Sequence, residues 1–590
     1  MDVALPLPPP PPPLPRGEGR FQRRLATFTL TLETCAVEHP YFLHHQVLLQ
    51  EAVAACDRRG YYSVFPESAS PRIYGEHAAA EGQAAFEARR GLLFELDLPA
   101  RIGTVGAEVS PYGLPLGIRY PKVDVDGLLA AMHKAQAGWL DAGPNAWAAT
   151  CVEILQRLNR HSFEMAHAVM HTTGQAFMMA FQAAGPHAQD RGLEAVAYAW
   201  RETSRIPKTA LWDKPQPKGD PLRMEKHYRV VPRGIALVIG CCTFPTWNGY
   251  PGIFANLATG NAVLVKPHPG AILPLALTVK IAREVLAEGG FDPNLVTLFA
   301  HEANDPAPQA LALRPEVKII DFTGSPANGQ WLEKEARGAI VFTEKAGVNQ
   351  IVIDSSDHLA GLVKNIAFSL SLYSGQMCTA PQNIYVPRGG IDTPEGHLSF
   401  DEFAAALGEG LTKLLSDPAR AVEILGAIQN DAIVSRIELA RSLGGLVCDS
   451  VAITHPQLPG ARVRTPLLLK LQAEQADIYM REWFGPIAFV IATDDTAHSL
   501  RLAEAAVASH GALTFSVYTS SDTVRDAAIA VAERAGVALS VNLTGGVYVN
   551  QSAAFSDYHG TGMNAAANAA LTDSAYVANR FRVVQWRRHV

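Results

Sequence analysis

The sequence predicts an α/β fold built on parallel sheets. From residue 233 onward, strand-like and helix-like runs alternate along the chain. The strand-like runs are short and almost wholly apolar, as in Ile235–Ile239 and Ala262–Lys266, which is typical of strands buried on both faces. This alternation favours parallel sheets covered by helices on both sides. Such sheets bind ligands beyond the carboxyl ends of their strands, so functional residues are expected there.

The same periodicities predict the other elements. Residues 124–205 have a helical pattern, and Pro215–Val231 alternates as a hairpin does. Further helices are expected over Asn248–Ala258, Leu273–Glu288 and Gln330–Ala336, and further strands over Leu295–Ala300, Val317–Phe322, Ala339–Phe342 and Gln350–Ile353.

Composition limits the possible classes of protein. A chain of 590 residues predicts two or three domains, and 48% hydrophobic residues are enough for large cores. The net charge of −7 is spread along the chain, which argues against nucleic-acid binding. No apolar run reaches the roughly 18 residues of a membrane span. Seven cysteines without regular spacing indicate a reducing compartment, so we expect a cytoplasmic protein.

The N-terminal part carries no recognisable chemistry. Residues 1–20 are rich in proline, and we expect a disordered tail, with a polyproline ligand for a partner as the alternative. The run Pro8–Pro13 interrupts the apolar stretch that a signal peptide needs. Residues 21–121 are interpreted as an N-terminal extension of unassigned function.

One cysteine is presented as a nucleophile would be. Cys378 lies in Ser371–Pro381, just after a helix expected to begin at the N-cap Asp357 and to stop at Gly375. The residue is therefore expected on a tight turn at the edge of a packed element. The alternative is a small buried hydrophobic residue, which is what most cysteines are.

A carboxylate precedes this cysteine at the end of a strand. Glu344 follows Ala339–Phe342 and comes just before Gly347. A thiolate together with a base that activates water is the pair needed to form and hydrolyse a thioester.

Two other stretches suggest ligand sites. Gly324, Ser325 and Gly329 lie between a strand and a helix, where backbone N–H groups can hold a phosphate; a plain strand-to-helix turn is the alternative. His167 and His171 share one helical face, but the methionines around them are typical of a core. We therefore predict no metal site.

Three short motifs occur in the order found in one enzyme family. They are the GQMC around Cys378, FTGS at Phe322–Ser325 and EWFGP at Glu482–Pro486. With these motifs the chain resembles the aldehyde dehydrogenase superfamily from about Ala130 to its C-terminus. Longer stretches, such as SVNLTGGVYVNQSAAFSDYHGTG, resemble the branch of that superfamily that serves phenylacetic acid degradation.

The resemblance implies a division of the chain. A Rossmann-like cofactor domain would comprise residues 122–214 and 233–346, and an α/β catalytic domain residues 347–573. A small β oligomerisation element would comprise residues 215–232 and 574–590, which implies a homo-oligomer, either a dimer or a tetramer.

The resemblance also implies residues that hold a nicotinamide dinucleotide. Lys266 would lie near the adenosine ribose, Ser325 and its neighbours near the pyrophosphate, and Glu482 and Phe484 near the nicotinamide ribose and ring. For Phe484, core packing is the alternative. NAD-preferring members often carry a glutamate where this chain has Pro269. We therefore expect NADP to be preferred over NAD, attracted by Lys266 and His268.

The implied reaction begins when the Cys378 thiolate attacks an aldehyde. Hydride then leaves for the nicotinamide, and water activated by Glu344 releases a carboxylic acid. One position departs from the family: Thr243 stands where an asparagine donates to the oxyanion. Losing such a donor costs on the order of 10²–10³ in rate. Asn248 would compensate only if the loop differs.

The resemblance implies an aldehyde substrate, specifically a coenzyme A-linked semialdehyde of aerobic phenylacetate degradation. Longer relatives carry a further hydratase domain that opens the ring, a step expected elsewhere for this chain. One alternative is a coenzyme A-acylating dehydrogenase, against which Glu344 argues. The other is a catalytically weak homologue that serves as a binding or scaffold subunit, which Thr243 keeps open.

Overall fold

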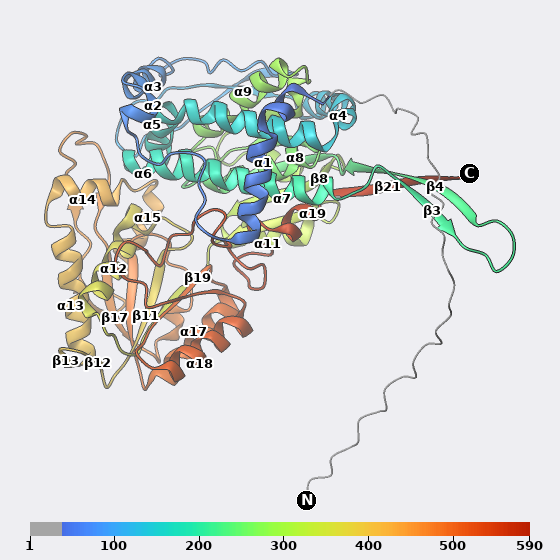
Figure 1. Cartoon of the computed structure of the whole chain (residues 1–590). Coiled ribbons are helices and arrows are strands. Elements are labelled where there is room, and N and C mark those ends of the chain that lie inside the picture. Colours follow the sequence, from blue (N-terminus) through green and yellow to red (C-terminus); the bar gives the residue numbers. More distant parts are fainter. Residues whose placement is uncertain (1–37) are drawn as a thin grey trace, which may run out of the picture. The chain divides into compact units, whose positions relative to one another are not determined.

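The computed structural model describes residues 38–590 (Figure 1). The tail predicted for residues 1–20 lies outside this range. The described chain opens with helices and one small hairpin, which together form a helical layer. These elements are α1 (Pro40–Arg58), α2 (Pro71–Tyr74), α3 (Ala78–Glu87), β1 (Arg101–Val105), β2 (Tyr120–Val123), α4 (Val125–Arg160), α5 (Ser162–Thr173), α6 (Phe177–Gln182) and α7 (Ala188–Ser204).

A five-stranded parallel sheet follows, in the order β7-β6-β5-β8-β9. Its strands match the predicted runs, except that the stretch expected over Leu295–Ala300 is shorter. Asp292 caps a 3₁₀ turn over Pro293–Leu295, so the strand begins only at Val296. The elements are β5 (Ile235–Ile239), α8 (Pro245–Ala258), β6 (Ala262–Lys266), α9 (Leu273–Glu288), β7 (Val296–Leu298), α10 (Ala307–Ala312), β8 (Val317–Gly324), α11 (Pro326–Glu335) and β9 (Ile340–Lys345).

A seven-stranded sheet forms the second half, in the order β14-β17-β18-β11-β10-β19-β20. All of its strand pairs are parallel except β14 with β17. The strands are β10 (Asn349–Ile353), β11 (Pro381–Pro387), β14 (Gly445–Cys448), β17 (Leu467–Gln472), β18 (Ile487–Thr493), β19 (Thr514–Tyr518) and β20 (Ala538–Val541).

Helices cover both faces of this sheet, with separate apolar clusters on the two sides. The helices are α12 (Leu359–Ser371), α13 (Phe400–Leu414), α14 (Pro418–Leu425), α15 (Asp431–Ala440), α16 (Ala476–Tyr479), α17 (Thr496–His510) and α18 (Asp522–Ala535). Two short hairpins pair β12 (Ile391–Thr393) with β13 (Gly396–Leu398) and β15 (Ala452–Ile453) with β16 (Val463–Arg464).

A three-stranded antiparallel arm extends away from the helices (Figure 1). It consists of β3 (Thr209–Lys214), β4 (Leu222–Pro232) and β21 (Phe581–His589), in the order β21-β4-β3. The predicted hairpin is confirmed, but its first strand precedes Pro215, because the prolines and glycine at 215–221 form the turn. The arm exposes several large apolar side chains, among them Trp586 and Val584.

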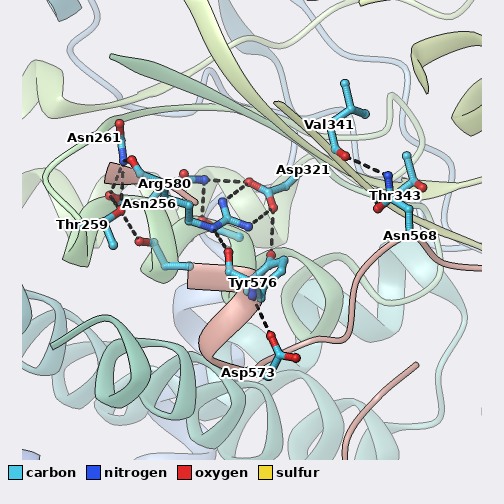
Figure 2. Close-up of polar contacts among 12 residues, drawn as sticks. Asn256, Thr259, Asn261, Asp321, Val341, Thr343, Asn568, Asp573, Tyr576 and Arg580 are labelled. Carbon is cyan, nitrogen blue, oxygen red and sulfur yellow. Dashed lines mark hydrogen bonds and ion pairs between the residues drawn. The ribbon is translucent and has the colours of Figure 1, made fainter. Parts of the chain in front are cut away.

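A buried ion pair ties the C-terminus to the five-stranded sheet (Figure 2). The Arg580 guanidinium donates to both oxygens of Asp321 on β8, at 2.6 and 2.7 Å. Tyr576 of α19 (Ser574–Ala578) and Asn256 donate to the same carboxylate, at 2.8 and 2.7 Å. Because this carboxylate has a donor on every side, the chain segment after residue 573 is fixed in place.

Candidate active site

The turn that carries Cys378 has an unusual backbone. The preceding helix ends at Ser371, and Tyr373, Ser374 and Gly375 then all adopt positive φ, at 52°, 49° and 62°. A Cβ atom on Gly375 would lie 2.5 Å from the carbonyl oxygen of Gly485, so only glycine fits there. The helix predicted to stop at Gly375 thus ends at Ser371, and the turn begins at Leu372. The predicted N-cap at Asp357 is wrong, because His358 is the N-cap residue and makes no side-chain cap.

A buried amide fixes the end of this turn that carries Cys378. Asn349 of β10 donates to the carbonyl oxygens of Cys378 and Ala380, at 2.8 and 2.9 Å. Its own carbonyl oxygen accepts from the backbone N–H groups of Leu513 and Thr514, both at 3.0 Å. The half-buried Cys378 is therefore positioned by its backbone, leaving the thiol free to react.

Glu344 lies beside this thiol, as the sequence predicts. It is buried near the end of β9, and the Asn248 amide donates to its two oxygens at 3.0 and 3.1 Å. Burial alone would raise the pKa of this carboxyl. Two effects outweigh burial and lower the pKa of Glu344: the charge of the neighbouring His559, and hydrogen bonds from His559, Cys378 and Asn248. The group is thus ionised at neutral pH and can act as a base.

His559 completes the site, and sequence reasoning missed it. Its Nε2 atom lies 3.2 Å from Glu344 Oε1 and 4.0 Å from Cys378 Sγ. Its Nδ1 atom lies 3.3 Å from the Ser552 hydroxyl. The residue belongs to an irregular loop, and only the glycines after it mark a turn. No local pattern shows that this loop returns to Glu344.

Burial and the nearby Glu344 carboxylate raise the pKa of the Cys378 thiol well above its usual value. The thiol is therefore protonated in this arrangement. A positive charge or a proton acceptor close to Sγ has to favour the thiolate when the site works.

Thr243 does not line the cavity that contains Cys378. Its carbonyl oxygen accepts from Gln175 at 2.8 Å, and its hydroxyl lies near the Cys241 thiol. Asn248, one turn into α8, lines the cavity instead. Its carboxamide both lines the cavity and donates to Glu344.

The glycines near the predicted phosphate loop serve packing. A Cβ atom on Gly329 would lie 2.6 Å from the Lys345 side chain, and one on Gly324 would lie 2.8 Å from the Phe322 ring. Ser325 is the N-cap of α11 and accepts from the Asn328 N–H at 3.4 Å. The first-turn N–H groups of α11 are thus at the carboxyl end of β8.

Lys266 ends β6 and is 8% exposed. Burial lowers the pKa of its ammonium to about 8, and among residues 38–590 it forms no ion pair. Burial and Lys266 lower the pKa of His268 to about 4, so this ring is neutral at pH 7. His301 Nε2 is buried without a partner in the described chain. His301 Nδ1 donates to the Glu302 carbonyl oxygen at 2.8 Å, which leaves Nε2 of this neutral ring as an unpaired acceptor. An ammonium donor together with this acceptor fits ribose hydroxyls, so the group suits a dinucleotide.

Glu482 and Phe484 are both half-buried on the segment before β18. Burial, partly offset by Arg436, raises the pKa of Glu482 to about 7. Trp483 is buried, and its ring centroid lies 6.1 Å from that of Phe489, so this tryptophan belongs to the core.

A cavity of about 580 Å³ opens onto Cys378. Much of its lining is apolar or aromatic, and one wall comes from residues 61–67 of the N-terminal extension. Asp190 fixes that wall by accepting from the Ser63 hydroxyl at 2.6 Å and the Val64 N–H at 3.0 Å. The aromatic lining residues are Tyr61, Tyr62, Phe244, Trp247, Phe368 and Tyr548, and the acidic ones Glu67, Asp190, Glu423 and Asp557.

The two histidines considered as metal ligands lie elsewhere. His167 and His171 stack on Phe86, with ring centroids 5.8 and 5.1 Å apart, and His171 Nδ1 is 3.0 Å from the Ser110 hydroxyl. Both rings therefore pack inside the helical layer. The six cysteines within residues 38–590 are free thiols, and no helix of that range is long and apolar enough to cross a membrane.

Comparison with known proteins places these features in context. The family described as "Aldehyde dehydrogenase family" matches residues 119–579. The structure of an NAD-dependent aldehyde dehydrogenase from Burkholderia multivorans is 64% identical, with a TM-score of 0.93, over 94% of this chain and 99% of that one. A 1-pyrroline-5-carboxylate dehydrogenase from Thermus thermophilus (R100A mutant) shares the fold at 18% identity, with a TM-score of 0.70, over 90% and 99% of the two chains.

Among curated proteins, the aldehyde dehydrogenase LUC3 of Fusarium is 28% identical over 307 residues, which are 52% of this chain. A putative aldehyde dehydrogenase, FUS7, of Gibberella fujikuroi is 27% identical over 322 residues. The matched regions span only 60% and 62% of these two relatives.

Proposed function

Because the chain belongs to the aldehyde dehydrogenase family, we propose that it oxidises an aldehyde to a carboxylic acid with a nicotinamide dinucleotide. The observation that carries this proposal is the pairing of a cavity-lining thiol, Cys378, with an ionised carboxylate, Glu344. A thiol adds to an aldehyde, and a carboxylate base then brings water to the thioester.

The chain's own residues divide the work. As Cys378 Sγ forms a bond to the aldehyde carbon, the thiol proton passes to the carbonyl oxygen, giving a thiohemiacetal. A bound nicotinamide would accept the hydride from the carbon of this adduct. With its hydroxyl proton lost to solvent, the adduct becomes a thioester on Cys378. Glu344 then takes a proton from a water molecule while the oxygen of that water attacks the thioester. The carbon–sulfur bond breaks, the carboxylic acid leaves, and the Cys378 thiol is restored. His559 holds the carboxylate of Glu344 through this step.

We propose that Asn248 and the backbone around Cys378 supply the oxyanion donors. Thr243 faces Cys241, so its hydroxyl is not directed at the cavity. A Thr243→Val variant should then keep its kcat within a few-fold, whereas the loss of an oxyanion donor costs on the order of 10²–10³.

For the cofactor, we propose that NAD is used and that NADP is also accepted. The similar enzyme from Burkholderia multivorans is NAD-dependent. Pro269 leaves this chain without the acid that would repel a 2′-phosphate. The NADP preference expected from Lys266 and His268 rests on Lys266 alone, since the His268 ring is neutral at pH 7.

For the substrate, we propose a semialdehyde linked to coenzyme A. The chain would then be a short form of the phenylacetic acid degradation protein PaaN, without the hydratase domain of longer relatives. The apolar cavity suits the acyl part. The lining has four acidic residues, Glu67, Asp190, Glu423 and Asp557, against Arg420 and His187. This excess of carboxylates disfavours phosphates inside the cavity, so the nucleotide of coenzyme A would lie outside it. We also propose that the arm formed by β3, β4 and β21 joins subunits through its exposed apolar side chains.

The test is a nicotinamide absorbance assay on the purified protein with several aldehydes, including a coenzyme A-linked semialdehyde, and with NAD and NADP in parallel. Reduced cofactor that appears with wild type and not with Cys378→Ala supports the proposal. Cofactor binding without reduction by any aldehyde favours the scaffold alternative. A product that forms only when free coenzyme A is present favours acylating chemistry.

A further inference from the structure

Three ligand atoms of different chemistry converge where Cys378 and His559 line the cavity. The Glu344 carboxylate, the Cys378 thiol and the His559 imidazole offer one atom each, and these atoms lie within 4.8 Å of one another. The nitrogen is 3.2 Å from the carboxylate oxygen and 4.0 Å from the sulfur. In tetrahedral zinc sites, bond lengths of about 2.0–2.3 Å separate neighbouring ligand atoms by roughly 3.3–3.6 Å. The nitrogen–oxygen distance of 3.2 Å agrees with this, and the sulfur at 4.0 Å from the nitrogen has to move inward by a few tenths of an ångström when a cation binds.

We propose that Glu344, Cys378 and His559 form a binding site for a thiophilic divalent cation, Zn²⁺ above all, whose occupancy blocks the nucleophile. Three protein ligands with an open fourth position are typical of exposed zinc sites. The cavity provides both that position and the entry path. Thiolate and imidazole ligands select Zn²⁺ over Mg²⁺ or Ca²⁺, which prefer oxygen.

The surroundings hold these ligands as an outer shell would. Arg191 donates to the Ser552 hydroxyl at 3.2 Å, and that hydroxyl lies 3.3 Å from His559 Nδ1. The Trp247 ring packs edge-on against His559, with centroids 4.6 Å apart. Partners on the far nitrogen of a histidine fix its orientation and thereby raise metal affinity. Here they direct Nε2 at the thiol and the carboxylate.

The charges also match a dication. When Zn²⁺ binds, the S–H bond of Cys378 breaks, a Zn–S bond forms, and one proton passes to the buffer. The thiolate and the Glu344 carboxylate then carry two negative charges, which the dication neutralises. No change of oxidation state is involved, so a chelator that removes the ion restores the thiol.

The test titrates the chelator-treated full-length protein with ZnCl₂ against a chromophoric chelator. Wild type should bind one tight equivalent. Cys378→Ser, Glu344→Gln and His559→Gln should each weaken it at least tenfold, and Ser552→Ala by about 10–100-fold. The matched control is Cys448→Ala, which removes a half-buried thiol elsewhere and should bind as wild type does.

A second measurement does not depend on any aldehyde. Zn²⁺ should protect Cys378 from alkylation by iodoacetamide, read by peptide mass spectrometry, and EDTA should reverse the protection. Co²⁺ should give a thiolate charge-transfer band that Cys378→Ser lacks. Two results would overturn the proposal. In the first, wild type binds Zn²⁺ no more tightly than the three ligand variants do. In the second, Cys378 is alkylated equally fast with and without Zn²⁺. Neither readout requires turnover, so the failure of this site and of the dehydrogenase proposal are distinguishable.

Discussion

The turn that carries Cys378 and the loop that carries His559 reach the same thiol by different means. The turn follows α12 directly, and buried groups of the seven-stranded sheet hold it. The loop, residues 551–573, is largely irregular. It is held by one bridge within itself, His559 to Leu571, by one bridge to distant chain, Ala567 to Glu344, and by Phe555 and Leu571 in the large apolar cluster. Displacing the nucleophile therefore means disturbing the core of the seven-stranded sheet, whereas two bridges and a few buried side chains decide where the loop lies.

The sharpest difference between the two regions should appear on removing the nucleophile. Cys378→Ala should lower aldehyde-dependent cofactor reduction by about 10⁴-fold or more, because no other group can form the thioester. Cofactor binding, followed by fluorescence titration, should be unchanged. Turnover at a tenth of the wild-type rate would show that Cys378 is not the nucleophile.

The segment that follows the loop depends on its ion pair with the five-stranded sheet. Asp321→Asn leaves the fully buried Arg580 without its counter-charge, which should cost about 3–5 kcal/mol of unfolding free energy in a urea titration. Glu504→Gln breaks the exposed pair with Arg534 and is the control, with an expected loss below about 1 kcal/mol. Equal losses would mean that the buried pair does not anchor the C-terminus.

A smaller change should loosen the loop itself. Asn568 accepts from the Thr343 N–H and donates to the Val341 carbonyl, both at 2.8 Å, and so extends β9 beside Glu344 (Figure 2). Asn568→Ala should cost about 1–3 kcal/mol of stability and lower kcat more than it raises KM. Gln216→Ala, which removes an exposed bond in the arm, should change neither quantity. An unaltered kcat in Asn568→Ala would show that the position of the loop does not affect catalysis.

The smallest expected effect is a pH dependence of cofactor binding. Burial raises the pKa of Glu482 to about 7, so its carboxylate accepts ribose hydroxyls above pH 7 and becomes protonated below. The KM for the dinucleotide should therefore rise up to about tenfold between pH 8 and pH 6. Glu482→Gln should give a flat profile over this range. A wild-type profile that is equally flat would remove Glu482 from the cofactor site.

The same two regions show what could be predicted from the sequence. Four strands of the five-stranded sheet and a turn with Cys378 after a helix depend on local periodicity, and these predictions are confirmed. The prediction was wrong at element ends: β7 begins at Val296, His358 is the N-cap of α12, and Glu344 lies within β9. His559 joins the site through a contact 181 residues away along the chain, with Cys378, and the wall of residues 61–67 through one 127 residues away, from Ser63 to Asp190. Periodicity carries no information about such contacts. Thr243 was predicted as the oxyanion position because it matches a place in a family motif. A motif does not show that its hydroxyl lies near Cys241 and not in the cavity.

One measurement tests the central claim most directly: stopped-flow absorbance of the reduced nicotinamide for wild type and Glu344→Gln with a turned-over aldehyde. Wild type should continue at a steady rate. Glu344→Gln should release about one reduced cofactor per subunit and then nearly stop, with an acyl adduct on Cys378 in the intact mass, because water is no longer activated. Steady turnover of the variant at the wild-type rate, with no adduct, would contradict the assignment of Glu344 as the base.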